Sequence, residues 1–185
     1  MELRDIVLFG LGTLFFLGVS RHALRNPMAH GFYRFFAWEC MLALVVLNYR
    51  HWHSNLLSPP QIVSWLLLAL SLALAIHSVL RLTRQGGNAG QQRADAALLH
   101  FEKTSHLVTD GVYRYIRHPM YAALLYLAWG IYLKNITGPT TTLVLLASGF
   151  LWMTALRDEA ECQAYFGQAY RDYMRRSKRF VPFLL

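Results

Sequence analysis

The chain has 185 residues, of which 55% are hydrophobic and 15% are charged, and its mean hydropathy is +0.28. Its 18 Lys and Arg residues outnumber its 10 Asp and Glu residues, which gives a net charge of +8. This composition excludes a disordered chain and an ordinary soluble domain. Because the apolar residues gather in long runs, we expect an integral membrane protein surrounded by membrane lipids.

Five apolar runs are the expected membrane-spanning helices. A bilayer core about 30 Å thick needs roughly 20 helical residues, and the third and fifth runs come close to this length without an acidic or basic residue other than one histidine. The three shorter runs need flanking Arg, Tyr or Trp side chains that reach the interface. In chain order the runs are Ile6–Ser20, Phe35–Tyr49, Ile62–Leu80, Met120–Leu133 and Gly138–Leu156. The expected fold is an all-α membrane protein of about five transmembrane helices.

The positive charges predict the orientation of these helices. With five spans, 15 of the 18 Lys and Arg residues fall on one side, and only Arg4, Arg50 and Lys134 fall on the other. Lys and Arg collect on the cytoplasmic side of membrane proteins. We therefore expect an N-terminus outside and a cytoplasmic C-terminus, in the inner membrane if the protein is bacterial. The positive surplus then reflects topology and contact with anionic lipids, and no nucleic-acid binding is expected.

Several polar residues in or near the spans allow more than one interpretation. Glu39 lies inside the second run, where a carboxylate is a functional candidate by default, although it could also pair with Arg34 or reach the interface. The His51-Trp-His53 segment is more typical of interfacial residues than of metal ligands. Cys40 and Cys162 are expected at different levels of the membrane, so neither a disulfide nor a metal site is expected.

The chain is expected to form a single membrane domain in three parts. These are a three-span front half at 1–83, a cytosolic loop at 84–118, and a helical hairpin with a tail at 119–185. Within the loop, the spacing of apolar residues from Asp95 to Leu107 predicts a short interfacial helix, and Asp110-Gly111 predicts a turn.

The tail beyond Leu156 has the pattern of an amphipathic helix. One face would carry the aromatic residues and the other the basic ones: Phe166, Tyr170 and Tyr173 against Arg171, Arg175 and Arg176. Such a helix can anchor the chain at the membrane surface and also line a site.

The segment Tyr113-Arg-Tyr-Ile-Arg-His-Pro-Met-Tyr121 is the strongest candidate for chemistry. Pro119 suits the first turn of a helix, which places Arg117 and His118 at the helix entrance. Free backbone N–H groups and the helix dipole make this end positive. An Arg and a His beside it predict a receptor for an anion.

A short turn at Lys134–Gly138 predicts that the last two spans form a helical hairpin. The hairpin returns the chain to the same membrane face and brings Arg157-Asp158-Glu159 close to Arg117 and His118. The result would be a pocket with donors on one wall and carboxylates on the other, covered by the Tyr-rich tail. Interfacial Arg, His and Tyr residues and purely structural Arg–Glu pairs would give a similar pattern.

The segment from Leu107 to Pro182 resembles the integral-membrane methyltransferase superfamily of isoprenylcysteine carboxyl methyltransferases and phospholipid methyltransferases. Four pieces carry the resemblance in order: Gly111-Val-Tyr113, Arg117-His-Pro-Met-Tyr121, Asp158-Glu159, and Phe166-Gly-x-x-Tyr170-x-x-Tyr173 followed by Pro182. Asp158 stands where a second Glu is common, and Ala123 stands where Gly is frequent.

The resemblance implies S-adenosylmethionine as cofactor, held between the last two spans and the C-terminal segment at the cytosolic face. It implies cofactor contacts from Tyr113, His118, Tyr121 and Asp158, with Tyr170 closing the pocket. It also implies that Arg117 and Glu159 form the catalytic polar pair at the reacting end.

The resulting hypothesis is an S-adenosylmethionine-dependent methyltransferase that acts on a small or lipid-like hydrophobic acceptor, with no obligate protein partner. A dry pocket that opens to lipid favours methyl transfer from a cationic donor to an anionic nucleophile. Two alternatives remain. One is a membrane reductase of the sterol reductase type, which would bind NADPH in a similar architecture, and the other is a non-enzymatic membrane protein that keeps the hairpin for packing.

Overall fold

The computed structural model describes residues 2–85 and 104–182, which form six α-helices and three short 3-10 turns. The α-helices are α1 (Leu3–Ser20), α2 (His30–Asn48), α3 (Pro59–Gln85), α4 (Pro119–Tyr132), α5 (Gly138–Phe166) and α6 (Gln168–Arg176). The turns are η1 (Ala23–Arg25), η2 (Tyr49–His51) and η4 (Gly111–Arg114). The described ranges contain no β-strand beyond one isolated bridge, which confirms the all-α prediction.

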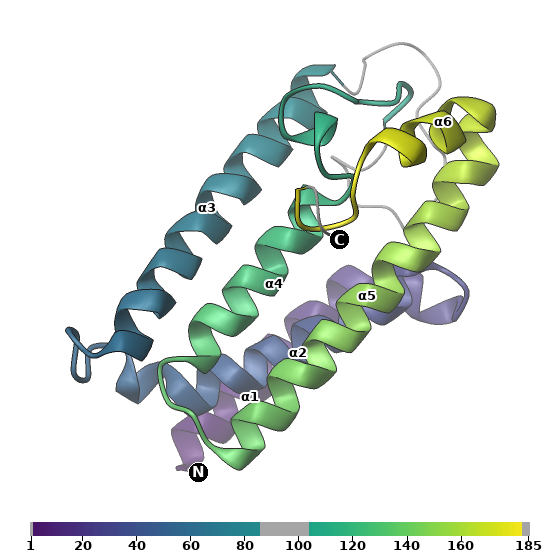
Figure 1. The fold of residues 1–185 in the computed structure, drawn as a ribbon. Coiled ribbons are helices and arrows are strands. Elements are labelled where there is room, and N and C mark those ends of the chain that lie inside the picture. Colours follow the sequence, from purple (N-terminus) through teal and green to yellow (C-terminus); the bar gives the residue numbers. More distant parts are fainter. Residues whose placement is uncertain (1, 86–103, 183–185) are drawn as a thin grey trace.

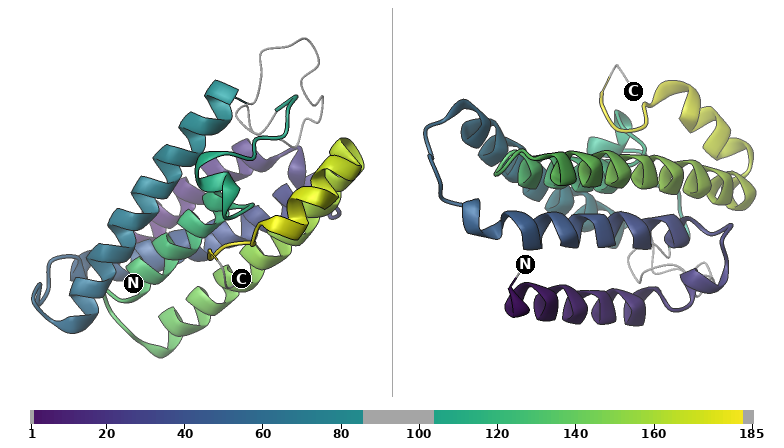
Figure 2. Two further views of the ribbon diagram at one scale, coloured as in Figure 1. Left: turned by 45° about the horizontal axis from the view of Figure 1, so that its top comes forward. Right: turned by 90° about the horizontal axis from the view of Figure 1, so that it is seen from below.

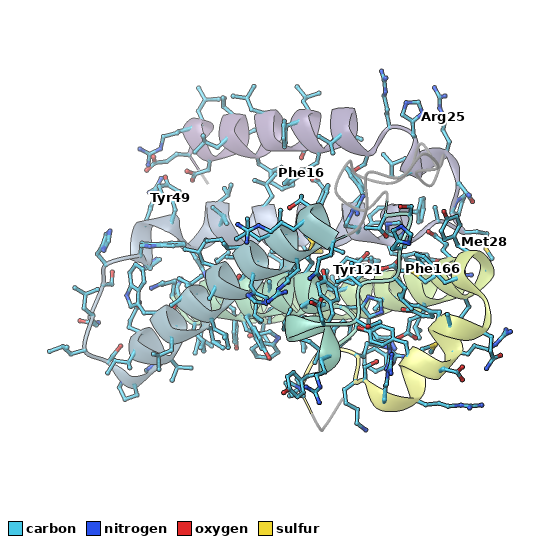
Figure 3. All side chains as sticks on the ribbon, turned by 90° about the horizontal axis from the view of Figure 1, so that it is seen from above. Phe16, Arg25, Met28, Tyr49, Tyr121 and Phe166 are labelled. Atoms are coloured by element: carbon cyan, nitrogen blue, oxygen red, sulfur yellow. The ribbon has the colours of Figure 1, made fainter. Side chains whose placement is uncertain are left out.

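The long helices form a bundle in which α4 lies between α3 and α5 (Figure 1). Helix α2 packs against α5, and α1 packs on the outer side of α2, so that α1, α2 and α5 form successive layers (Figure 2). The inner face of α1 contacts α2 through Phe16, whose ring centroid lies 5.2 Å from that of Trp38 (Figure 3). The outer face of α1 exposes large apolar side chains such as Leu11 and Leu14, as expected of a helix in lipid.

Helix α3 has an inverted distribution of polarity. Its buried residues are all polar, namely Gln61, Ser64, Ser71 and Ser78, whereas many of its large aliphatic side chains, such as Leu66, Leu72 and Ile76, are exposed. Two of the serines bond to backbone carbonyls of α4, since Ser64 Oγ donates to Gly130 O over 2.6 Å and Ser71 Oγ donates to Ala123 O over 2.7 Å. Small polar residues at helix contacts and apolar residues outside are typical of helices that pack within a membrane.

Four of the helices are long and apolar enough to cross a membrane: Leu3–Ser20, His30–His51, Pro59–Gln85 and Gly138–Phe166. Helix α4, the expected fourth span, has 14 residues and a length of about 21 Å at 1.5 Å per residue. It falls short of a bilayer core about 30 Å thick. The structure therefore supports a multi-pass membrane protein, while the count of five spans, the division into three parts and the sidedness stay predictions.

The predicted hairpin of α4 and α5 is present, and its turn leads into a capped helix. Thr137 is the N-cap of α5, where its hydroxyl accepts from the N–H of Thr140 over 3.4 Å and its own N–H donates to the hydroxyl of Thr140 over 2.9 Å. This reciprocal pairing satisfies two backbone donors and fixes the start of α5. The hydrophobic cores of α2, α4 and α5 meet beside it, in a cluster of Met41, Leu44, Ala128, Ile131, Val144 and Ala147.

The prediction of one tail helix beyond Leu156 is wrong in its bounds. Helix α5 continues through Arg157 to Phe166 and ends at Gly167, whose φ of 59° favours glycine. Helix α6 then begins in a new direction (Figure 1). The predicted faces are correct, because α6 buries Tyr170 and Tyr173 and exposes its three arginines.

In the segment before α4, only part of the sequence prediction can be compared with the structure. Most of the expected interfacial helix, Asp95 to Lys103, lies outside the described residues, and Thr104–Leu107 at its end are not helical. The turn at Asp110-Gly111 is present, with Gly111 at a φ of 57°. A Cβ at Gly111 would lie 2.9 Å from Arg81 Nε, so α3 approaches this turn too closely for a side chain.

Candidate functional site

The candidate site forms where the entrance of α4 meets the last turns of α5 and the C-terminal segment. The C-terminal segment pairs with the chain before α4 through backbone hydrogen bonds: Lys178 N donates to Tyr115 O over 2.9 Å, and Arg117 N donates to Lys178 O over 2.7 Å. A third bond runs from His118 N to Arg179 O over 3.1 Å. These backbone bonds alone fix the main chain of Arg117 and His118, without help from side chains.

The predicted pair of Arg117 and Glu159 is present and buried. Arg117 Nε donates to Glu159 Oε1 over 3.0 Å, and the two side chains are 9% and 5% exposed. Arg179 shares the same carboxylate, donating from Nε to Oε1 over 3.0 Å and from Nη2 to Oε2 over 2.8 Å. Arg117 Nη1 also donates to the carbonyl oxygens of Met174 and Ser177. One carboxylate therefore holds two guanidinium groups, and one of them ties α4 to the end of α6.

His118 lies between the two carboxylates of α5. Its Nδ1 is 3.4 Å from Asp158 Oδ2, and its Nε2 is 3.4 Å from Glu159 Oε1. Its ring stacks on Tyr121 at a centroid distance of 5.3 Å, and the Tyr121 hydroxyl donates to Asp158 Oδ2 over 3.2 Å. Burial opposes protonation of His118, but the hydrogen bonds and charges of Asp158 and Glu159 outweigh burial and raise its pKa.

Helix α6 covers this group with two tyrosines. The Tyr173 hydroxyl donates to the carbonyl oxygen of Tyr113 over 2.6 Å, and the rings of Tyr170 and Tyr173 meet edge to face at 5.8 Å. Burial raises the pKa of both phenols well above the ordinary value. Both tyrosines therefore stay neutral and present aromatic surface, and Tyr173 also donates a hydrogen bond.

These residues enclose a cavity of about 110 Å³. Six of the seven predicted site residues line it: Tyr113, Arg117, His118, Tyr121, Asp158 and Tyr170. Glu159 is absent from the lining and lies behind Arg117. Figure 3 shows Tyr121 of α4 and Phe166 at the end of α5 toward the end of the bundle that carries Met28, away from Tyr49.

Part of the cavity lining is aliphatic. It is formed by Leu82 at the end of α3, by Leu107 and Val108, and by Met120 in the first turn of α4. The lining thus combines charged groups with aliphatic side chains.

Comparison with known proteins identifies the family. A sequence profile of the phospholipid methyltransferase family matches residues 59–172, which is more than half of the chain and includes all seven predicted site residues. The chain belongs to the phospholipid methyltransferase family. The resemblance to this superfamily that the motifs predicted is confirmed, and nothing in the comparisons favours a sterol reductase or a non-enzymatic protein.

Curated relatives of this methyltransferase carry a related name. The chain is 25% identical over 175 residues to a probable protein-S-isoprenylcysteine O-methyltransferase of Oryza sativa subsp. indica. The aligned segment covers 94% of this chain and 90% of the rice protein. The protein of the same name from Oryza sativa subsp. japonica matches equally. A protein-S-isoprenylcysteine O-methyltransferase of Schizosaccharomyces pombe is 29% identical over 100 residues, or 52% of this chain and 41% of its own. No solved structure gives a significant match.

Within the candidate site, the contacts of Arg179 were not predicted from the sequence. The residue was counted only among the cytoplasmic charges, because no motif marks the path by which the C-terminal segment returns to α4. Conversely, Arg157 was expected near Arg117, but its guanidinium lies 5.8 Å from the ring centroid of Tyr33 and so faces α2. Consecutive residues on a helix point in different directions, which is why Arg157 and Glu159 separate.

A link between α2 and α5 was also not predicted. His30, which is 1% exposed, donates its backbone N–H to Glu161 Oε1 over 2.8 Å, and its Nδ1 lies 2.8 Å from Glu161 Oε2. The potential ligand atoms of His30, Asp158 and Glu161 all lie within 4.8 Å of one another. The two contacts between His30 and Glu161 hold the entrance of α2 against α5 beside the candidate site.

The remaining sequence candidates lie away from the site. Glu39 accepts a hydrogen bond from the Thr13 hydroxyl over 2.8 Å, so it pairs with α1. His53 stacks on Trp65. The two cysteines are free, and they separate, since Cys40 lies in α2 while Cys162 lines the cavity of the candidate site.

Proposed function

We propose that this membrane methyltransferase uses S-adenosylmethionine as methyl donor and transfers the methyl group to a lipid-like acceptor in the cavity beside α4. One observation carries the proposal. The same cavity presents aromatic faces and a carboxylate, which suit a cation, next to a guanidinium, which suits an anion. Family membership supports methyl transfer as the reaction.

The residues present fit the chemistry of this cofactor. A sulfonium cation would be stabilised by the Asp158 carboxylate and by the faces of Tyr121 and Tyr170. Arg117 Nη2 makes no hydrogen bond within the described part of the chain, so it can donate to an anionic group at the reacting end. Ligand clefts usually measure roughly 300 Å³ or more, so the lining side chains must move apart to admit the whole cofactor.

The aliphatic part of the lining supports a lipid-like acceptor. Leu82, Leu107 and Met120 offer an aliphatic surface to a hydrocarbon chain, and Arg117 lines the same cavity. The names of the relatives specify isoprenylcysteine and the name of the family specifies phospholipids. We therefore propose an acceptor with a hydrocarbon chain and a carboxylate or amine headgroup.

When bound, the cofactor supplies an electrophilic methyl group on a sulfonium. Arg117 would orient an anionic group at the reacting end. Glu159 and Arg179 would act through Arg117 as positioning residues, because both oxygens of the Glu159 carboxylate accept hydrogen bonds from the two guanidinium groups. The covering tyrosines would exclude water, which favours methyl transfer to a carboxylate, because that step neutralises charge and requires no strong base. An amine would attack in its neutral form and would release a proton after the transfer.

Methyl transfer can be measured with the purified full-length protein and isotopically labelled S-adenosylmethionine. A prenylcysteine analogue and phosphatidylethanolamine serve as separate acceptors, and label in the extracted lipid identifies the headgroup. The Arg117→Ala and Glu159→Ala variants should lose turnover while staying monodisperse in detergent. Unchanged rates in both variants would contradict the roles proposed for this pair.

Cofactor binding can be measured independently of the acceptor. Cys162 lines the cavity, and Cys40 in α2 is the second of the two cysteines of the chain. In a Cys40→Ser variant, S-adenosylhomocysteine should slow the alkylation of Cys162, whereas in a Cys162→Ser variant it should leave the alkylation of Cys40 unchanged. Protection by NADPH instead would support a reductase, and no calorimetric binding of S-adenosylhomocysteine at millimolar concentration would refute the proposal.

A further inference from the structure

A second polar cavity lies at the opposite end of the bundle from the methyltransferase site, where α4 turns into α5 and η2 leads into α3 (Figure 1). Its central residue is Lys134, a cation that is only 4% exposed. The Lys134 ammonium lies 3.7 Å from the ring centroid of Trp65 and 5.3 Å from that of Trp52. Two indole faces therefore shield this charge from solvent.

Gln61 fixes the position of the ammonium. Its Nε2 donates to the carbonyl oxygens of His51 over 3.3 Å and of Lys134 over 3.2 Å. Because both carbonyls take the amide donors, Gln61 Oε1 must face Lys134, and it accepts from Nζ over 3.0 Å. Gln61 itself is 4% exposed, so the hydrogen-bonded pair of Gln61 and Lys134 is held in place by the surrounding residues.

Lys134 has no anionic partner in the described part of the chain. The carboxylates at this end belong to Glu2 and Asp5, and both pair with Arg50. A buried ammonium without a counter-charge is unfavourable, and this desolvation lowers the pKa of Lys134. One hydrogen bond to Gln61 leaves the ammonium with donors to spare, since a lysine carries three.

The cavity next to Lys134 has a volume of about 250 Å³ and contains no acidic residue in its lining. Its polar lining includes an imidazole, hydroxyl groups and amide groups, from His51, Ser54, Asn55, Ser58 and Asn135, in addition to Gln61 and Lys134. Hydroxyl and amide groups can donate to an anion with several oxygens, and Lys134 supplies the charge.

We propose that this cavity binds a phosphate group, with Lys134 as its counter-ion. A phosphate offers more acceptor oxygens than a carboxylate and so matches several donors around one ammonium. Trp52 and Trp65 beside the cavity are of the residue type that concentrates at the membrane–water interface. At that level the phosphate can come from a lipid headgroup or from free phosphate in the water.

Binding can be measured on the full-length protein in detergent by native mass spectrometry and calorimetry, with two probes. One is inorganic phosphate and the other is short-chain phosphatidylglycerol. We expect saturable binding of one molecule, weakened about tenfold or more in Lys134→Gln and retained in Lys134→Arg. Lys178→Gln removes one positive charge from an exposed side chain at the other end of the molecule and should leave phosphate binding unchanged.

A second variant keeps the test valid if Lys134→Gln fails to fold. Asn135→Asp replaces the amide of a half-buried side chain at the cavity with a carboxylate of the same shape, which places a negative charge beside Lys134. It should abolish binding without disturbing the Gln61 pair. Binding of the lipid alone identifies a headgroup site, and binding of both probes or of inorganic phosphate alone identifies a site for the phosphate group itself. No saturable binding of either probe, or binding undiminished in Lys134→Gln and Asn135→Asp, would overturn the proposal.

Discussion

Substitution of Glu159 by glutamine tests whether one carboxylate holds the methyltransferase site together. The change keeps the shape of the side chain but removes the charge that accepts three hydrogen bonds from Arg117 and Arg179. It also removes one of the two carboxylates beside His118. Glutamine can accept only at its single oxygen, and its amide nitrogen would face donors.

The structure gives the size of the expected effect. Breaking a buried ion pair by removing one partner costs about 3–5 kcal/mol. The lower end applies here, because Arg117 keeps its bonds to two backbone carbonyls and the Arg179 side chain is 19% exposed. A loss of about 3 kcal/mol corresponds to a fall of roughly 6–12 °C in the unfolding temperature for a chain of this size.

Thermal unfolding of the detergent-purified protein, followed by tryptophan fluorescence, measures this loss. The Trp152 ring lies 4.7 Å from the Arg179 guanidinium and so reports on the site directly. Glu2→Gln is the matched control, since the Glu2 side chain is 62% exposed and water screens its pair with Arg50. If Glu159→Gln unfolds at the same temperature as Glu2→Gln, the carboxylate does not hold the two arginines and the reasoning fails.

Three further predictions concern the same end of the molecule. The folded state raises the pKa of His118 above its ordinary value of 6.5. The protonated His118 therefore stabilises the fold fully below pH 6.5, and this stabilisation is lost as pH rises through the raised pKa. The unfolding temperature should fall more steeply with pH in the wild type than in His118→Gln. Tyr173→Phe leaves the buried carbonyl of Tyr113 without its donor and should lower the free energy of unfolding by about 1–2 kcal/mol in a denaturant titration, while far-ultraviolet circular dichroism stays unchanged. Gly167→Ala should cost about 1–3 kcal/mol through backbone strain alone, since nothing lies within 4 Å of an added Cβ; an unfolding temperature equal to that of the wild type would show that the turn between α5 and α6 relaxes.

The contact between Arg117 and Glu159 could be predicted because it depends on short-range geometry. Pro119 marks the start of α4 and a turn of five residues joins α4 to α5, so two antiparallel helices had to bring residues 42 positions apart together. Hydrophobic period and turn length are readable from one sequence. The same reasoning found the buried face of α6, whose tyrosines recur at helical spacing.

The position of Arg179 could not be predicted because it depends on a long-range backbone pairing. The segment that carries it is attached to residues 115–118 by isolated hydrogen bonds, which leave no periodic pattern in the sequence. The bounds of α5 were missed for a related reason. Arg157 to Glu159 are charged and look like the end of a span, but the helix continues past them because their side chains are satisfied by Tyr33, Tyr121, Arg117 and Arg179.

The depth of the site depends on α3, although α3 contributes only Leu82 to the cavity. Helix α4 is too short to fix its own height in a bilayer, so its position must come from its neighbours. Ser64 bonds to Gly130 and Ser71 bonds to Ala123. The two serines are seven residues apart along α3, and their partners are seven residues apart in the opposite direction along α4. This register permits only one height for Pro119 against α3 and therefore for Arg117 and His118 before it.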